Sequence, residues 1–200
     1  VPQGCLVLPK PGSTNVYYLF HGTVDDPATT TAHYLYMTTV DMTLNDGLGA
    51  VVTKNQVIIN DTLNVGRITA VRHANGRDWW VFCHKVDTNM YYRVLVTPYG
   101  VLQAGVQSIG LVRPRDFGQA CFSPAGDRFA YWAYNYLEVF DVDRCTGLFS
   151  NAIQAHTTDT LVQIGAAFSP NGHYIYITAG TNVYQYDAEA VDFSASQVHV

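Results

Sequence analysis

Short apolar runs alternate with glycine-containing turns along the whole chain, and this pattern recurs four times. In each unit an apolar run leads into a turn and then into a second run rich in Tyr, Trp, Val and Ile. Such residues favour β-strands, and a glycine turn between two such runs indicates a hairpin. The pattern therefore predicts four β-hairpins. Their first strands are Leu6–Leu8, Ile68–Val71, Ala120–Phe122 and Ala166–Phe168, and their second strands are Val16–Phe20, Trp79–Phe82, Phe129–Trp132 and Tyr174–Ile177.

The turn sequences are the strongest sign of repetition. Residues 122–127 read FSPAGD and residues 168–173 read FSPNGH, while residues 74–77 (ANGR) place an Asn-Gly pair in the second unit. An Asn-Gly pair supplies the positive φ that a tight hairpin turn requires, and a proline two positions earlier ends the first strand. The glycines at 12, 76, 126 and 172 lie 64, 50 and 46 residues apart, within or somewhat above the length of one propeller blade.

Each hairpin continues into further strand-like sequence. Third strands are predicted at His33–Met37, Tyr91–Val96, Leu137–Val142 and Asn182–Asp187, and fainter fourth strands at Val57–Ile59, Val106–Ile109, Ala152–Gln154 and Val198–Val200. Helical spacing of apolar residues is not sustained for more than a turn. The chain thus divides into four units of four strands, with approximate boundaries 1–63, 64–113, 114–160 and 161–200.

Four-stranded antiparallel units in tandem predict an all-β fold, a single β-propeller region of about four blades over residues 1–200. Each blade of a propeller buries both faces against its neighbours, which explains strands as uniformly apolar as Trp79–Cys83. A half-exposed sheet would instead alternate apolar and polar residues. A large β-sandwich is the competing interpretation, but sandwich strands need not recur as matched four-strand units.

Composition and charge exclude several functional classes. Hydrophobic residues form 48% of the chain, yet no run approaches the roughly 18 apolar residues of a transmembrane helix. Only 14% of residues are charged, the net charge is -5, and the 11 lysines and arginines are scattered singly. Nucleic acid is therefore an unexpected partner, because it would require a basic stripe.

Candidate catalytic chemistry is sparse. His73 follows Arg72 in a hairpin turn, and Asp78 comes five residues later; Asp127 and His173 occupy similar turns. An active site would require such side chains to converge from several blades on one channel mouth. The serines of the Ser-Pro turns are better explained as turn caps than as nucleophiles. The histidines show no metal-binding spacing, so we expect no catalytic, metal or cofactor site.

Two further features have mainly structural interpretations. The segment 41–47 (DMTLNDG) superficially resembles a calcium loop, but its glycine is one place late and no bidentate Glu follows; a polar hairpin loop explains it better. The four cysteines contain no C-x-x-C pair, and we expect them to be buried free thiols, with one or two disulfides as the alternative. They are Cys5, Cys83, Cys121 and Cys145.

Residues 68–81 (ITAVRHANGRDWWV) and 92–101 (YRVLVTPYGV), together with 40–49 (VDMTLNDGLG), resemble the WD40-like propellers of Bacteroidetes cell-surface proteins. The resemblance runs over nearly the whole chain. Proteins of that family are typically large, are exported by the type IX secretion system, and carry a sorting or gliding-motility-associated domain. The Gly-His and Trp-Asp signatures of eukaryotic WD repeats are absent here.

The resemblance implies a location and a larger ring. It places the protein outside the cell or on the outer-membrane surface of a bacterium. The family commonly has about seven blades, so we expect these four to be an arc of a larger propeller within a longer polypeptide; a closed four-bladed ring is the alternative. The tripeptides at Asp61–Leu63 and Asp159–Leu161 resemble the O-glycosylation acceptor site of Bacteroidetes proteins, which makes Thr62 and Thr160 candidate glycosylation sites.

Three functional hypotheses follow. The leading one is a non-enzymatic surface propeller that binds protein or glycan partners, because rim loops on a stiff frame usually supply binding surfaces. The alternative is an accessory or active-site-bearing propeller of a larger hydrolase or of a lactonase-like or quinoprotein-like enzyme, which rests on Arg72, His73, Asp127 and His173. The third is a structural component of a multi-protein surface assembly.

Overall fold

A computed structural model describes residues 3–25, 31–115, 117–158 and 164–200 of the chain. Within these residues, four sheets each contain four consecutive antiparallel strands, and we number them blades 1 to 4. Blade 1 contains β1 (Cys5–Pro9), β2 (Val16–Gly22), β3 (Thr31–Asp41) and β4 (Ala50–Asn64); blade 2 contains β5 (Thr69–Arg72), β6 (Trp79–His84), β7 (Thr88–Thr97) and β8 (Gly100–Arg113). Blade 3 contains β9 (Gly118–Phe122), β10 (Arg128–Ala133), β11 (Tyr136–Asp143) and β12 (Leu148–His156); blade 4 contains β13 (Ile164–Phe168), β14 (Tyr174–Ala179), β15 (Asn182–Asp187) and β16 (Val198–His199).

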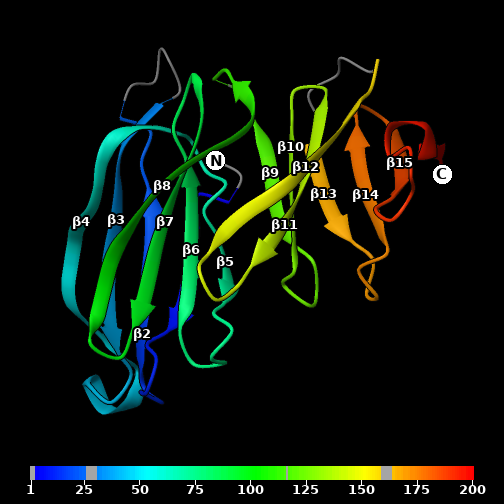
Figure 1. The fold of residues 1–200 in the computed structure, drawn as a ribbon. Helices are drawn as coiled ribbons and strands as arrows, with labels where there is room; N and C mark the ends of the chain where they lie inside the picture. The colour runs from blue at the N-terminus through cyan, green and yellow to red at the C-terminus, as the bar shows by residue number, and fades with distance from the viewer. Residues whose placement is uncertain (1–2, 26–30, 116, 159–163) are drawn as a thin grey trace.

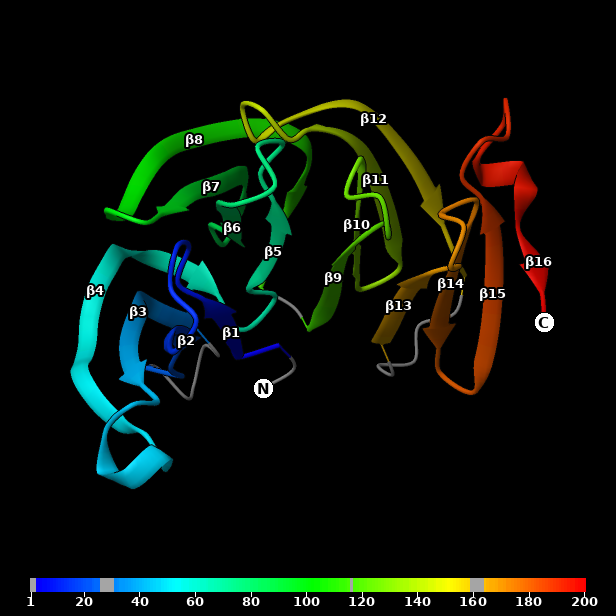
Figure 2. The same ribbon diagram turned by 90° about the horizontal axis from the view of Figure 1, so that it is seen from below.

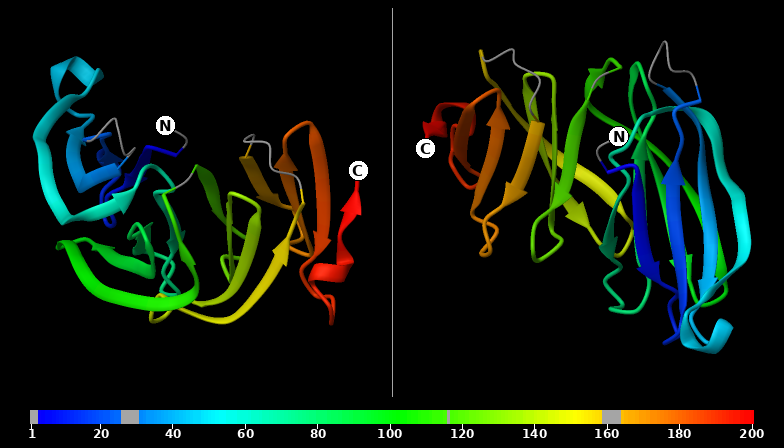
Figure 3. Two further views of the ribbon diagram at one scale, coloured as in Figure 1. Left: turned by 90° about the horizontal axis from the view of Figure 1, so that it is seen from above. Right: turned by 180° about the vertical axis from the view of Figure 1, so that it is seen from behind.

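This arrangement confirms the predicted all-β fold of four-stranded antiparallel blades. Helical structure in the described residues is limited to the 3-10 turns η1 (Asn45–Gly47) and η2 (Ser194–Ser196). The first strand of each blade lies on the inner side of an arc and the last strand on its outer side, as Figures 1 and 2 show. The arc does not close between blades 1 and 4 (Figure 3).

The hydrophobic core is divided among the seams between adjacent blades. One cluster joins blades 1 and 2 and includes Phe20, Leu35 and Val94. A second joins blades 2 and 3, where the Phe129 and Phe149 rings stack with their centroids 4.8 Å apart. A third joins blades 3 and 4. Because each seam buries faces of two blades, every blade is stabilised by its neighbours.

Burial on both faces, which the sequence predicts for blades that lie between two neighbours, is found in the two central blades. Every residue of β6 after Trp79 and of β10 after Arg128 is buried. In β14, by contrast, buried and half-buried residues alternate, and β2 shows a similar pattern. Blades 1 and 4 are therefore less completely buried, as an open arc requires. The physical reason is that each of them has only one neighbour in the arc.

Glutamine side chains extend the hydrogen bonding from blade to blade. The Gln107 amide in β8 donates to the Phe149 carbonyl (2.6 Å) and accepts from the Phe149 N–H (2.8 Å) in β12. Gln3 forms the same pair of bonds with Ala120 of β9, at 2.7 and 2.9 Å. Each amide mimics a neighbouring peptide group, so it satisfies backbone atoms that pleated-sheet pairing leaves open.

A buried polar cluster lies where blades 1, 2 and 3 meet. Arg113 donates to Glu138 Oε2 from Nε (2.9 Å) and Nη2 (2.7 Å), and both side chains are almost completely buried. The buried His84 Nδ1 lies 2.9 Å from Asn64 Nδ2. Burial, with a smaller effect from Arg67 and Arg113, lowers the pKa of His84 to about 3, so its imidazole is neutral near pH 7.

Candidate functional site

The first hairpin turns of all four blades lie on the same rim of the arc, which is the lower edge in Figure 1. Blades 2, 3 and 4 share one turn geometry. Gly76, Gly126 and Gly172 have φ values of 71°, 73° and 74°, and each N–H donates to the carbonyl three residues earlier at 2.9 Å. This left-handed conformation is accessible to glycine at no steric cost, so the repeated glycine in the sequence reflects a repeated backbone.

The residue three places before each glycine caps its turn. In blade 3 the Ser123 hydroxyl accepts from the Arg128 N–H at 3.0 Å, and in blade 4 the Ser169 hydroxyl accepts from the Tyr174 N–H at 2.9 Å. In blade 2 this position is His73, whose Nδ1 accepts from the Asn75 N–H at 3.0 Å. The two serines are turn caps, as expected, and His73 has a comparable structural role.

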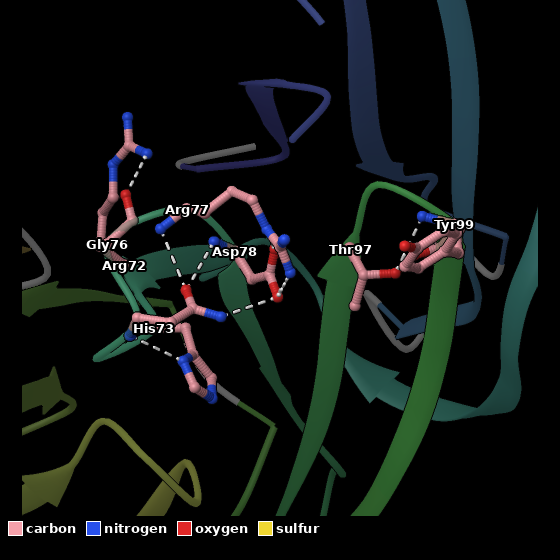
Figure 4. A network of polar contacts seen from close by, with 9 residues as sticks. Arg72, His73, Gly76, Arg77, Asp78, Thr97 and Tyr99 are labelled. Carbon is pink, nitrogen blue, oxygen red and sulfur yellow. Dashed lines mark hydrogen bonds and ion pairs between the residues drawn. The ribbon is translucent and has the colours of Figure 1, made fainter. Parts of the chain in front are cut away.

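The four residues of the enzymatic hypothesis are held by separate local partners. Arg72 lies over the Trp79 ring, with its guanidinium carbon 4.2 Å from the centroid, whereas the His73 ring stacks on Trp80. Figure 4 shows these two side chains pointing to different sides of the turn. No side-chain hydrogen bond, ion pair or ring contact joins any two of the four among the described residues. The remaining two are Asp127, which accepts from Ser123 Oγ (2.6 Å), and His173, which lies 3.3 Å from Asp187 and 3.1 Å from Glu189.

A more extended polar network surrounds Asp78 on the rim of blade 2 (Figure 4). Arg77 donates from Nε to Asp78 Oδ1 (2.7 Å) and from Nη2 to Oδ2 (3.1 Å), and Asn75 Nδ2 donates to Oδ2 (2.9 Å). The hydrogen bond from Arg77 is the main cause that lowers the pKa of Asp78. Because the buried carboxylate is bound on both sides, the neighbouring arginine is held in a defined position.

A cation-lined hollow opens next to this network, between the first turn of blade 1 and the first turn of blade 2. Its volume is about 330 Å³. Lys10, Arg72 and Arg77 contribute positive charge to its lining, and no carboxylate is among the residues described there. Pro9, Pro11 and Trp79 form stiff apolar walls. This hollow can accept an anionic group, and it is the best-defined candidate site on the rim.

Sequence reasoning missed Lys10, Arg77 and Trp79 as members of a site. Arg77 occupies the same turn position as Asp127 and His173, one residue after the turn glycine of its blade. Lys10 lies in the corresponding turn of blade 1. An alignment of the four turns shows that the first two each contain a cation, Lys10 in blade 1 and Arg77 in blade 2. Their convergence depends on how blade 1 packs against blade 2.

The other candidate residues have ordinary structural environments or stay untested. Thr62 lies half-buried in β4, where its N–H donates to Asp61 Oδ1 at 2.7 Å; Thr160 lies outside the described residues. Glycosylation of either stays a prediction. The 41–47 segment forms the hairpin loop after β3, where Asp41 Oδ1 accepts from the Thr43 N–H at 2.8 Å.

The four cysteines are free thiols rather than disulfides. Their expected burial was correct for Cys83 and wrong for Cys5 and Cys145, which are exposed; Cys121 is half-buried. Cys5 begins the inner strand of blade 1, which has no blade against its outer face, and Cys145 lies in a hairpin turn. Burial raises the pKa of the Cys83 and Cys121 thiols to about 12.

The fold belongs to the β-propeller class, here as an open arc of four blades. Solved structures that share it include the periplasmic gluconolactonase PpgL of Pseudomonas aeruginosa (14% identity, TM-score 0.60, covering 94% of this chain and 50% of that one). They also include hydrazine synthase of Kuenenia stuttgartiensis (10% identity, TM-score 0.55, 90% and 52%). A third is the β-propeller domain of Cps50 (Swd1) from Myceliophthora thermophila (9% identity, TM-score 0.53, 97% and 57%).

The chain thus spans half the length of the P. aeruginosa enzyme. At these identities the likeness concerns the fold alone. No protein-family model and no curated protein matches the sequence. None of the helices in the described part of the chain has the length and apolar character needed to cross a membrane.

Proposed function

We propose that this chain is a non-enzymatic recognition module, in which the propeller frame presents its rim to a protein or glycan partner. One observation carries the proposal: the rim residues that would form a catalytic centre are each bound by partners within their own blade, whereas an open, cation-lined hollow lies beside the first turn of blade 2. Rigid frames with variable rim loops are suited to binding.

Export by the type IX secretion system and a location on the outer-membrane surface belong to the same proposal. They are supported only by the resemblance of residues 40–49, 68–81 and 92–101 to the WD40-like propellers of Bacteroidetes surface proteins. Participation in a larger ring or in a surface assembly has the same support. Intact-mass analysis of the natively purified protein would test these expectations, because a sorting domain would add mass and new peptides beyond Val200.

The rival hypothesis is a lactonase-like activity, since the fold resembles that of a gluconolactonase. The direct test is hydrolysis of D-glucono-1,5-lactone by the purified chain, compared with a His73→Ala/His173→Ala double variant. We expect both proteins to match the uncatalysed rate. Turnover by the unmodified chain that the double variant lacks would overturn the proposal.

Recognition itself can be tested on immobilised glycans and on candidate surface proteins. We expect saturable binding to a defined set of anionic ligands, weakened by salt because the hollow is cationic. Binding that is equally strong to neutral ligands and independent of salt would contradict a role for the cation-lined hollow in recognition.

A further inference from the structure

The hollow between blades 1 and 2 has an electrostatic character opposite to that of the whole chain. The net charge of the chain is -5, yet three cations line this one hollow. Among the described residues, neither Lys10 nor Arg72 forms an ion pair, and the nearby Asp78 carboxylate is bound to Arg77. Three cations and one carboxylate leave two net positive charges at the site.

Two of the three cations are held in place by the protein itself. Arg72 Nη1 donates to the Gly76 carbonyl at 3.0 Å while the guanidinium lies flat against Trp79. Two hydrogen bonds to Asp78 fix Arg77, whose side chain stays 55% exposed. Lys10 is half-buried between Pro9 and Pro11. Arginine forks arranged in this way match the oxygens of an oxyanion, and little side-chain entropy is lost on binding.

We infer that this hollow binds a small phosphate monoester through Lys10, Arg72 and Arg77. A phosphate monoester carries roughly -1.5 to -2 charges near pH 7, which complements the two net positive charges, whereas a carboxylate or a sulfate ester carries about -1. A volume of about 330 Å³ accommodates a small organic molecule rather than a folded domain. The inference rests on the proposed function because it assigns a ligand class to the same rim.

The test is isothermal titration calorimetry of the whole chain at low salt with glycerol 3-phosphate, and with glycerol, methyl sulfate and acetate as comparison probes. We expect saturable 1:1 binding of glycerol 3-phosphate, weaker binding of methyl sulfate and acetate, and none of glycerol. The affinity should fall between pH 7 and pH 5, because the second phosphate proton binds near pH 6. Equal affinity for acetate and glycerol 3-phosphate would overturn the inference.

Two variants, Lys10→Gln and Arg72→Gln, each remove one positive charge from the hollow. Lys54→Gln is the matched control, because it removes one positive charge from an exposed position in β4 of blade 1. We expect a loss of at least about tenfold in affinity for the first two variants and little change for the control. Circular dichroism would establish that each variant is folded. Equal weakening by all three variants would show non-specific attraction and would overturn the inference.

The two proposals fail in different ways. Absence of phosphate binding with retained binding of a glycan or protein partner overturns the assigned ligand class and leaves the recognition module standing. Lactone hydrolysis overturns the recognition module and does not depend on the phosphate titration.

Discussion

Individual side chains in this propeller differ in chemistry mainly because of where the arc buries them. Cys5 and Cys145 are exposed to solvent, whereas Cys83 and Cys121 have pKa values raised to about 12 by burial. The thiolate is the reactive form of cysteine. The reactivity of each cysteine thiol should therefore decrease with the burial of its side chain.

Alkylation with iodoacetamide at pH 8 should modify Cys5 and Cys145 first. Cys83 and Cys121 should react only after unfolding, because burial both blocks access and suppresses ionisation. Peptide mass spectrometry after timed quenching measures the order. Early modification of Cys83 would contradict its position in the seam between blades 1 and 2.

The buried His84 makes stability depend on pH. Its folded pKa of about 3 lies below the roughly 6.5 of an unfolded histidine, so the unfolded chain binds the extra proton between these values. The free energy of unfolding should fall as the pH drops from about 6.5 toward 3, by up to about 1.4 kcal/mol per pH unit from His84. Above that range His84 should not change the free energy of unfolding.

Urea unfolding at pH 7, 6 and 5 measures this slope. His84→Gln should flatten it, whereas His33→Gln, which changes an exposed histidine of β3, should leave it unchanged. Equal slopes in the original chain and in the His84→Gln variant would show that His84 is not the titrating group.

At the scale of secondary-structure elements, side-chain amides continue the sheet hydrogen bonding across seams. Gln107→Leu would leave the Phe149 N–H and carbonyl without their partner, and an unsatisfied buried polar group costs about 1–3 kcal/mol. Gln103→Leu is the matched control, since Gln103 is an exposed residue of the same strand. Chemical unfolding should show a loss of stability for Gln107→Leu only; equal losses would assign the effect to strand propensity.

The elements themselves were largely predictable from sequence, because strands and hairpin glycines are local signals. Each predicted run overlaps a strand, with only Ile68 and Val200 lying just outside β5 and β16, and Gly76, Gly126 and Gly172 adopt the predicted positive φ. Contacts between blades were not predictable. The Gln107 amide bridge and the hollow lined by both Lys10 and Arg77 bring together residues far apart in sequence, and no periodicity of apolar residues specifies such pairs.

On the scale of the whole molecule, the open arc leaves apolar sheet surface at its ends. On blade 1 a depression of about 350 Å³ is lined by Val7, Tyr17, Leu19, Val40 and Met42. The apolar residues of β2 and β14 resemble those of the central blades, so these strand sequences alone do not distinguish a covered sheet face from an uncovered one. Exposed apolar surface of this kind binds hydrophobic probes.

The dye bis-ANS should therefore fluoresce strongly with the folded chain. Leu19→Lys should reduce the signal, because it places a charge in the blade 1 depression. Leu48→Lys changes a more exposed leucine outside it, with 78% of its surface accessible, and should have a much smaller effect. Equal reductions by both variants would place the dye elsewhere.

The bridge between Gln3 and Ala120 has a kinetic consequence. Its two ends are 117 residues apart in sequence, so the bridge cannot form until blade 3 has been built and placed beside the blades before it. We expect an interaction completed this late to be absent from the folding transition state, so that its loss accelerates unfolding while hardly slowing folding. The bridge formed by Gln3 should therefore affect the lifetime of the folded arc rather than the rate at which the arc folds.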